Sequence, residues 1–313
     1  MPYVCVGIFS HTKIVELRLK YRHENVAGAI KQLRIFYMQK DFFMYKLVAT
    51  DLDGTLLTRT REISEANIAS IKKSISRGMH FVIATGRPIE GIMHYAKKLD
   101  LLSNKGQYAI GFNGAVVYEL NPLRPICCCS LNGAEVKKMA RRAEELHINY
   151  HAFSTTRGLL ASVPNKWTDI EMSYNNIGCT MIDFNDIPDN EEFQKFMFCG
   201  TNDEVNGILD KVDDYREDYT VTRSAFCFLE VLNREATKGN GLKLLCEKIG
   251  IDLADTIAFG DEQNDLSLIE NAGLGVAMGN AVPELKKAAD LITCTNQDDG
   301  LSVVLEQILA DSQ

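Results

Sequence analysis

The sequence contains no long apolar run. Of its 313 residues, 46% are hydrophobic, yet no stretch approaches the roughly 20 consecutive apolar residues that cross a bilayer. The N-terminus also lacks the basic start and small-residue cleavage site of a signal peptide. These absences predict a cytoplasmic globular protein with no membrane partner, and the length allows two domains of about 100 to 200 residues each.

An excess of basic charge is also missing. The formal net charge is -8 at pH 7, and no basic stripe interleaved with aromatic residues occurs. The chain therefore offers no general attraction for nucleic acid. We expect a small-molecule partner rather than a polynucleotide, and the sequence leaves the oligomeric state open.

Paired cysteines are absent as well. The chain has nine cysteines, but none has the C-x-x-C spacing of a zinc site. The run Cys127, Cys128 and Cys129 would alternate between two faces of an extended segment, which hinders joint ligation of one ion. We interpret the cysteines as buried, reduced thiols.

The balance of charge changes near residue 44. Residues 1–43 carry seven Lys or Arg and three acidic residues, a net charge of +4, so the rest of the chain carries -12. We expect residues 1–43 to be a dispensable N-terminal extension and the working protein to begin near Met44. The alternative is a helix that packs Val26, Ile30 and Leu33 on the core or on another subunit.

The stretch from Tyr45 to Leu57 organises the chain. Its apolar first half ends at Asp51, Asp53 and Gly54, as a buried strand of a parallel sheet would, and ligands bind outside the carboxyl ends of such strands. Two carboxylates two residues apart can serve as nucleophile and as general acid and base. The alternative is structural, because Asp and Gly also favour turns.

Two further apolar runs end in the same way. The run His80–Ala84 leads into Thr85, Gly86 and Arg87, and a later run leads into Asn113. The alternation of strands with helical patterns predicts an α/β fold with a doubly wound parallel sheet. These polar groups would then meet at one edge of that sheet.

The same rhythm returns late in the chain. Lys238 opens a helical pattern, and the next buried strand leads into Asp261, Asn264 and Asp265. Carboxylates that converge repel one another unless a cation lies among them, and ligation by oxygen alone favours a hard ion such as Mg²⁺. A lysine and a hydroxyl beside that ion suit a phosphate dianion. Each of these residues also has a structural interpretation when taken singly. Thr85 could be a helix cap, Lys238 a solvated lysine, and the stretch 261–265 an acidic turn.

The segment between these two parts has a different pattern. We predict helices at 134–147, from about 165, at 189–194 and at 202–214. We predict strands near 149–153, 158–163, 179–184, 195–200, 218–223 and 226–232. These elements indicate an α+β cap domain, residues 126–233, inserted into a discontinuous core of residues 44–125 and 234–313.

On these motifs the sequence resembles the haloacid dehalogenase (HAD) superfamily, and within it the Cof-type (class IIB capped) phosphatases. The resemblance covers Met44 to about Leu309, and the extension 1–43 is the one departure. The matching motifs are DLDGT at 51–55, TGR at 85–87, NGA at 113–115, TKG at 237–239, GDEQND at 260–265, GNA at 279–281 and NQDDG at 296–300. The resemblance implies a HAD-like (Rossmann-like) core with an inserted cap, and Mg²⁺-dependent hydrolysis of small phosphorylated metabolites.

The resemblance also implies a role for each residue. Asp51 would attack phosphorus and form an aspartyl-phosphate, and Asp53 would act as general acid and base. Thr85 and Lys238 would hold the phosphoryl oxygens. Mg²⁺ would be ligated by Asp51, the Asp53 main-chain carbonyl and Asp261, with Asp265 orienting this set. Further contacts to phosphate or substrate would come from Gly54, Gly86, Arg87, Asn113 and Asn264.

Two other functions stay open at this point. A phosphomutase-like phosphotransferase also keeps Asp53, and a non-catalytic phospho-ligand sensor would not need Asp53 or Lys238. Sugar phosphates, pyridoxal phosphate and flavin mononucleotide are all candidate substrates. The cap residues that could select among them are also of types that commonly pack or lie in solvent: Tyr150, His151, Arg157, Trp167 and Arg223.

Overall fold

The computed structural model describes residues 45–311, so the prediction about residues 1–43 lies outside the described residues. The chain divides into two compact units. One contains the segments that end at Val82 and resume at Cys246, and the other is Ile83–Leu245. The predicted cap, residues 126–233, falls wholly within the second unit, and its boundaries stay a prediction.

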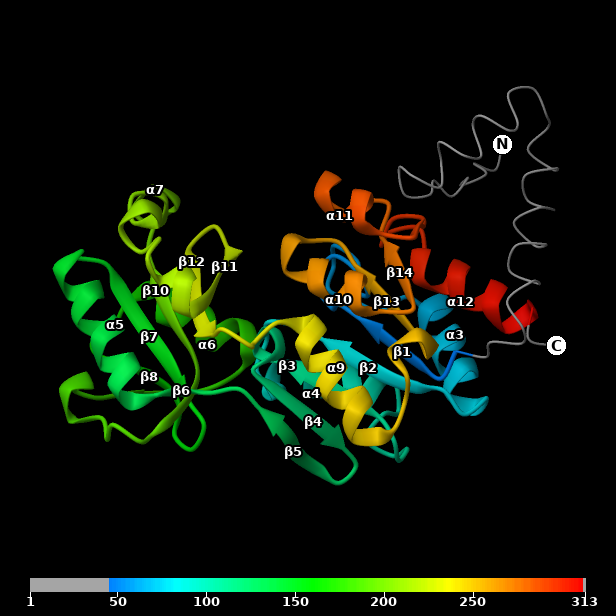
Figure 1. The fold of residues 1–313 in the computed structure, drawn as a ribbon, viewed down its shortest axis with the longest axis horizontal. Coiled ribbons are helices and arrows are strands. Elements are labelled where there is room, and N and C mark those ends of the chain that lie inside the picture. The colour runs from blue at the N-terminus through cyan, green and yellow to red at the C-terminus, as the bar shows by residue number, and fades with distance from the viewer. Residues whose placement is uncertain (1–44, 312–313) are drawn as a thin grey trace. The chain divides into compact units, whose positions relative to one another are not determined.

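The first unit is built on parallel strands in the order β15-β14-β13-β1-β2. Its strands are β1 Leu47–Thr50, β13 Thr256–Gly260, β14 Leu274–Ala277 and β15 Leu291–Ile292, and β2 His80–Ala84 continues into the second unit. Leu47 pairs with Thr256 in the parallel register of β1 and β13, which lie side by side in Figure 1. Every residue of β1 and β13 is buried, as the continuous apolar runs predicted.

Among the described residues, four α-helices lie wholly within the first unit. They are α3 Glu65–Ser76, α10 Leu266–Asn271, α11 Pro283–Ala288 and α12 Gly300–Asp311. Helix α3 is capped at its N-terminus by Ser64, whose hydroxyl accepts a hydrogen bond from the Asn67 main-chain amide at 3.2 Å. Its buried face combines Ile71 with the small polar side chains Asn67, Ser70 and Ser74. The Asn67 side chain accepts a bond from the Ser302 amide of α12 at 3.0 Å, which joins the two helices.

The second unit starts with the strand order β2-β3-β4-β5. Its first elements are α4 Ile89–Lys98, β3 Tyr108–Gly111, the 3-10 turn η1 Phe112–Gly114, β4 Val116–Leu120 and β5 Leu123–Cys128. Strands β3, β4 and β5 pair antiparallel. This part departs from the predicted parallel alternation, because the short η1 turn between β3 and β4 leaves no room for a crossover helix.

A second sheet has the order β11-β12-β10-β7-β8-β9, with β6 paired to β10. All its pairings are antiparallel except that of β8 with β9. Its strands are β6 Leu131–Asn132, β7 Asn149–Ser154, β8 Gly158–Ala161, β9 Cys179–Met181, β10 Glu192–Cys199, β11 Tyr219–Ala225 and β12 Phe228–Asn233. The sequence predicted this α+β layer and most of its strands.

Helices cover both faces of the second sheet. Phe196 and Phe198 of β10 belong to the cluster that includes α5 Gly133–Glu145, whereas Met197 belongs to the cluster that includes Trp167 of α6 Lys166–Asn175. Side chains of a strand alternate between faces, which explains this division. The sheet is therefore a two-sided core layer.

Two predicted helices in this layer are wrong. The helix expected at 189–194 is replaced by β10, because Phe193 and the aromatic residues after it are buried along the strand. The helix expected at 202–214 is broken into α7 Asn202–Asn206, η3 Leu209–Lys211 and α8 Tyr215–Asp218. Gly207 caps the end of α7, and glycine is a poor residue for continuing a helix.

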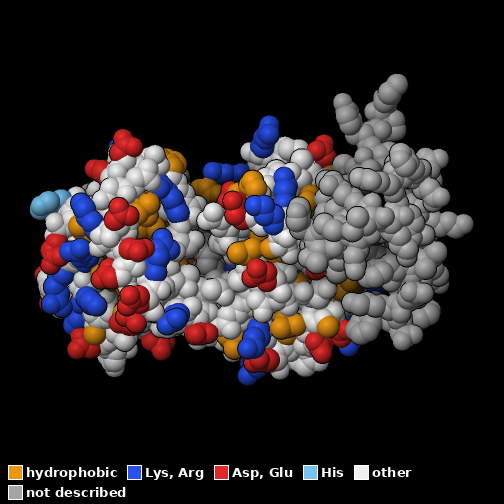
Figure 2. Space-filling view, turned by 45° about the horizontal axis from the view of Figure 1, so that its top comes forward, with side chains coloured by type: hydrophobic (Ala, Val, Ile, Leu, Met, Phe, Trp, Pro, Cys, Tyr) orange, Lys and Arg blue, Asp and Glu red, His pale blue; other side chains and the backbone are white. Residues whose placement is uncertain are grey.

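The surface of the described residues is mixed in charge. Figure 2 shows acidic and basic side chains interspersed on one face of the molecule. No helix within residues 45–311 is long and apolar enough to span a bilayer. The absence of a nucleic-acid partner remains a prediction.

A histidine is enclosed at the centre of the second sheet. The His151 ring lies 3.1 Å from the Thr168 hydroxyl through Nδ1 and 3.1 Å from the Met197 sulfur through Nε2. The side chain is completely buried. Burial, with a smaller contribution from the charge of Lys195, lowers the pKa of His151 to about 3. The imidazole is therefore neutral in the folded protein and fills a packing role.

This burial predicts acid sensitivity. Below its unfolded pKa of about 6.5 the unfolded chain binds a proton at His151 that the folded protein excludes, so stability falls as the pH drops from about 6.5 towards 3. The expected loss is about 1.4 kcal/mol per pH unit. Urea unfolding at pH 6.5 and 5 should therefore show a smaller decrease for His151→Gln than for wild type. The exposed His147, whose φ of 53° suits asparagine, supplies the control His147→Asn, and an equal decrease in all three proteins would contradict the prediction.

Candidate active site

Three aspartates of the first unit cluster at the ends of two parallel strands. Asp51 follows β1, Asp261 follows β13, and Asp265 lies in the next turn. One carboxylate oxygen of each lies within 4.8 Å of the others, and all three residues are buried. Three buried negative charges at this separation repel strongly unless a cation is present. The residues therefore fit a hard divalent ion, which oxygen ligands favour.

Asp265 holds the turn that presents Asp261. Its Oδ2 accepts hydrogen bonds from the main-chain amides of Asp261 and Glu262, both at 3.0 Å. These bonds fix the short turn η5 Gln263–Asp265. The arrangement agrees with an orienting role for Asp265.

Gly54 and Thr55 lie directly against Asp261. The Thr55 hydroxyl donates to Asp261 Oδ1 at 2.7 Å. Gly54 has a φ of +91°, and a Cβ atom there would lie 2.2 Å from Asp261 Oδ2. Only glycine allows both this backbone conformation and this approach.

Asn280 belongs to the same cluster, although no role for its side chain was predicted from the sequence. Its Nδ2 donates to the Gly54 carbonyl at 2.8 Å and lies 3.4 Å from Asp261 Oδ2. Its position just after the buried strand β14 was the available signal. Asp53 and Asn264, the other predicted residues of this unit, are partly exposed.

The remaining predicted residues lie in the second unit. Thr85, Arg87 and Asn113 are buried. The main-chain amide of Asn113 donates to the Thr85 main-chain carbonyl at 2.9 Å. A Cβ at Gly86 would lie 3.0 Å from Nδ2 of the Asn113 side chain. Asn113 has a φ of +55°, which asparagine tolerates better than most residues. The turn η1 Phe112–Gly114, called the Asn113 turn below, therefore packs against the turn at Thr85–Arg87.

The Asn113 turn also contacts the start of α9 Lys238–Ile249. A Cβ at Gly114 would lie 2.1 Å from the Thr237 carbonyl oxygen, immediately before Lys238. Lys238 is 1% exposed, and a buried ammonium group requires anionic or carbonyl partners. This burial agrees with the predicted phosphate contact, which stays a prediction.

Arg87 is engaged by aromatic residues. Its Nη2 donates to the Tyr174 hydroxyl at 3.0 Å, and the guanidinium lies 4.4 Å from the centre of the Tyr174 ring and 5.6 Å from that of Tyr95. Cation–π contacts of this kind fix an arginine in place. The predicted role of Arg87 in binding phosphate or substrate is not visible in these contacts.

The cap candidates named from sequence are structural in the described chain. Tyr150 and Trp167 belong to the two hydrophobic clusters, and the His151 ring packs edge-on against Phe153 and Phe228. Arg157 forms two hydrogen bonds with Glu191 at 2.8 and 2.7 Å. Arg223 donates to the Asn202 side chain and to main-chain carbonyls of its own hairpin.

Buried carboxylates at the carboxyl ends of parallel strands define an α/β enzyme with a polar site at the sheet edge. The sequence profile of the haloacid dehalogenase-like hydrolases matches residues 48–305. The chain belongs to this family.

Individual relatives agree with this assignment. YxeH of Bacillus subtilis (strain 168) is 32% identical over 271 residues, which cover 85% of this chain and 99% of YxeH. The 5-amino-6-(5-phospho-D-ribitylamino)uracil phosphatase YcsE of the same strain is 29% identical over 266 residues, covering 85% and 96% of the two chains. The solved HAD subclass IIB sugar phosphatase BT4131 superposes with a TM-score of 0.72 at 26% identity, covering 84% and 98%. The chain is a phosphatase of this family.

The contact between Gly54 and Asp261 gives a test of the cluster. Gly54→Ala would bring a left-handed backbone cost of about 1 to 2 kcal/mol and a steric clash with the Asp261 carboxylate. Gly78→Ala is the matched control, because Gly78 has a φ of +87° and open space around it. We expect Gly78→Ala to lower stability slightly and Gly54→Ala to lower it at least twice as much, with weakened binding of divalent ions. Thermal melts and calorimetric titration with Mg²⁺ measure both effects, and equal behaviour of the two variants would rule out the close contact.

Proposed function

We propose that this phosphatase hydrolyses small phosphate monoesters through a covalent aspartyl-phosphate on Asp51, with Mg²⁺ as its cofactor. The observation that carries the proposal is the buried cluster of Asp51, Asp261 and Asp265 at the ends of β1 and β13. Sugar phosphates are the substrate class we favour, since the solved relative BT4131 is a sugar phosphatase.

In the first step, an Asp51 carboxylate oxygen attacks phosphorus while the bond between phosphorus and the ester oxygen breaks. Asp53 donates its proton to the leaving alkoxide, which departs as an alcohol. In the second step, the Asp53 carboxylate removes a proton from water as the water oxygen attacks phosphorus. The bond to Asp51 breaks, inorganic phosphate leaves, and both aspartates return to their starting states.

Mg²⁺ would be held by Asp51, Asp261 and the main-chain carbonyl of Asp53, with Asp265 orienting the set, and would supply charge neutralisation that lets Asp51 approach an anionic ester. The proposed contacts to the transferring phosphoryl group come from Thr85 and Lys238. Residues proposed to contact phosphate or substrate in addition are Gly54, Gly86, Arg87, Asn113 and Asn264.

We further propose that residues 126–233 form the cap that encloses the leaving group and selects the substrate. One face of the sheet within this range has a hydrophobic core made wholly of residues of the range, which supports a domain able to act as a lid. Aspartate at position 53 favours a catalytic role over that of a non-catalytic phospho-ligand sensor, because release of phosphate needs a base that activates water.

The nucleophile can be tested by Asp51→Asn. An amide is neither a nucleophile of comparable strength nor an anionic ligand, so hydrolysis of p-nitrophenyl phosphate should fall by at least a thousandfold while the thermal melt stays cooperative. Asp252→Asn serves as the control, because Asp252 caps a 3-10 turn through an oxygen that asparagine also offers. Activity of Asp51→Asn within tenfold of wild type would exclude Asp51 as the nucleophile.

The cofactor can be tested by removing it. EDTA should abolish hydrolysis by the wild-type protein, and added Mg²⁺ should restore it. Ca²⁺ should restore it poorly, because its larger radius and looser coordination would misplace the carboxylates. Full activity in the presence of chelator would contradict the proposed metal site.

A further inference from the structure

A buried ion network lies in the second unit. Lys195 Nζ lies 2.7 Å from Glu230 Oε1 and 3.7 Å from Glu171 Oε1, and each of the three side chains is at most 7% exposed. The ammonium group also lies 5.1 Å from the centre of the Phe153 ring and 5.7 Å from that of Phe112. Replacing a buried ion pair by apolar side chains of similar volume often leaves the folded protein as stable as before or more stable. Stability alone therefore does not account for these charges.

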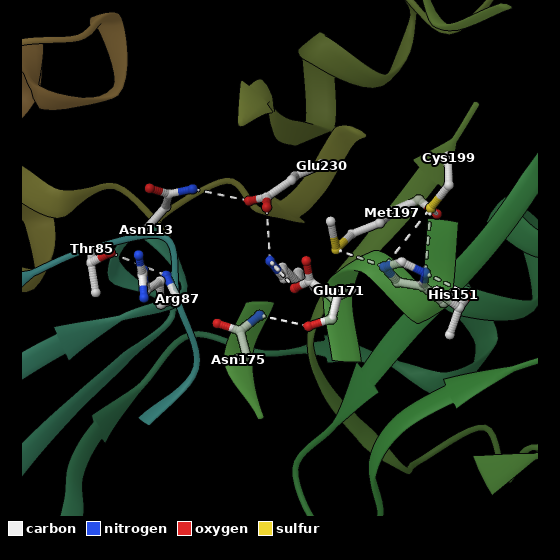
Figure 3. Close-up of polar contacts among 11 residues, drawn as sticks. Thr85, Arg87, Asn113, His151, Glu171, Asn175, Met197, Cys199 and Glu230 are labelled. Atoms are coloured by element: carbon white, nitrogen blue, oxygen red, sulfur yellow. Dashed lines mark hydrogen bonds and ion pairs between the residues drawn. The ribbon is translucent and has the colours of Figure 1, made fainter. Parts of the chain in front are cut away.

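The second oxygen of Glu230 leads to the Asn113 turn. Its Oε2 accepts a hydrogen bond from Asn113 Nδ2 at 3.0 Å, so the carboxylate bridges Lys195 and Asn113, as Figure 3 shows for the bond between Glu230 and Asn113. A carboxylate suits this place because each of its two oxygens accepts a hydrogen bond, one from the Lys195 ammonium group and one from the NH2 group of the Asn113 side chain.

The Asn113 turn contacts Thr85, which is assigned to the phosphoryl group, and Thr237, which directly precedes the other assigned residue, Lys238. The main-chain amide of Asn113 donates to the Thr85 main-chain carbonyl at 2.9 Å. Gly114, the next residue, lies so close to Thr237 that a Cβ would come within 2.1 Å of its carbonyl oxygen, and Lys238 follows directly. One turn therefore sets the positions of Thr85 and of the helix start that carries Lys238.

We propose that Glu230 is a positioning residue for catalysis: held by Lys195, it fixes the Asn113 side chain and so the turn on which Thr85 and Lys238 depend. This proposal rests on the proposed function, in which Thr85 and Lys238 bind the transferring phosphoryl group. Displacement of these groups by a fraction of an ångström lowers the rate of the chemical step more than it lowers substrate binding.

Two double variants separate this role from that of a structural ion pair. Lys195→Met/Glu230→Gln removes both charges but keeps an oxygen that can accept from Asn113. Lys195→Met/Glu230→Met removes the charges and the acceptor. Burial raises the pKa of Glu171, so that carboxyl can take up a proton when Lys195 is lost, in both variants alike. Of the two proteins, only the Gln variant can accept the hydrogen bond from Asn113.

The expected result is a difference in kcat. With p-nitrophenyl phosphate and Mg²⁺, the Gln variant should keep kcat within about threefold of wild type, and the Met variant should lose at least tenfold, with KM changed less than kcat. The melting temperatures of the two variants should agree within a few degrees. Equal kcat values in the two folded variants would overturn the proposal.

An Asn113→Ala background supplies a second measurement. If Glu230 acts through Asn113, the difference in kcat between the Gln and Met variants should disappear in that background. Persistence of the full difference would show that Glu230 acts by another route. If the Met variant does not fold, Lys195→Met/Glu230→Ala carries the same comparison. An inactive wild-type protein would instead refute the proposed function, so the two failures are distinct.

Discussion

Repulsion among buried carboxylates is the constraint on which the first unit depends. Parallel pairing of β1 with β13 forces Asp51 and Asp261 to the same sheet edge, and Asp265 adds a third buried carboxylate within 4.8 Å. Hydrogen bonds reduce the free-energy cost of burying these charges. The Thr55 hydroxyl and the side-chain amide of Asn280 donate to Asp261, and main-chain amides donate to Asp265. Neutral donors offset only part of three negative charges, so the site is built to receive a cation.

This constraint also explains the chain order. Strands β1 and β13, which precede Asp51 and Asp261, are adjacent in the sheet but far apart in the sequence. Parallel neighbours need a crossover connection, and here the connection is long enough to contain a second sheet with a core of its own. A family phosphatase can thus vary this second layer without moving the aspartates.

The sequence predicted local features well and distant partnerships poorly. Apolar runs identified β1, β2 and β13 and placed Asp51 and Asp261 at their ends, because a buried parallel strand has a distinct pattern. The polar stretch before Phe193 resembled a helix, and the burial of β10 between its neighbours overrode that local preference. Asn280 and Glu230 were missed because their partners, Gly54 and Asn113, lie 226 and 117 residues away.

The buried negative charge is balanced in a different way in each of the two clusters, the aspartate cluster and the network around Glu230. The aspartate cluster needs a cation from outside the protein, so its charge balance depends on solution conditions. Glu230 receives its cation from Lys195 of the same chain, so its carboxylate stays in place whether or not ligands are bound. The Asn113 turn that it holds is therefore ordered in advance. Under the proposed function, the groups of this turn that bind phosphate would then need no reorganisation when metal and substrate arrive.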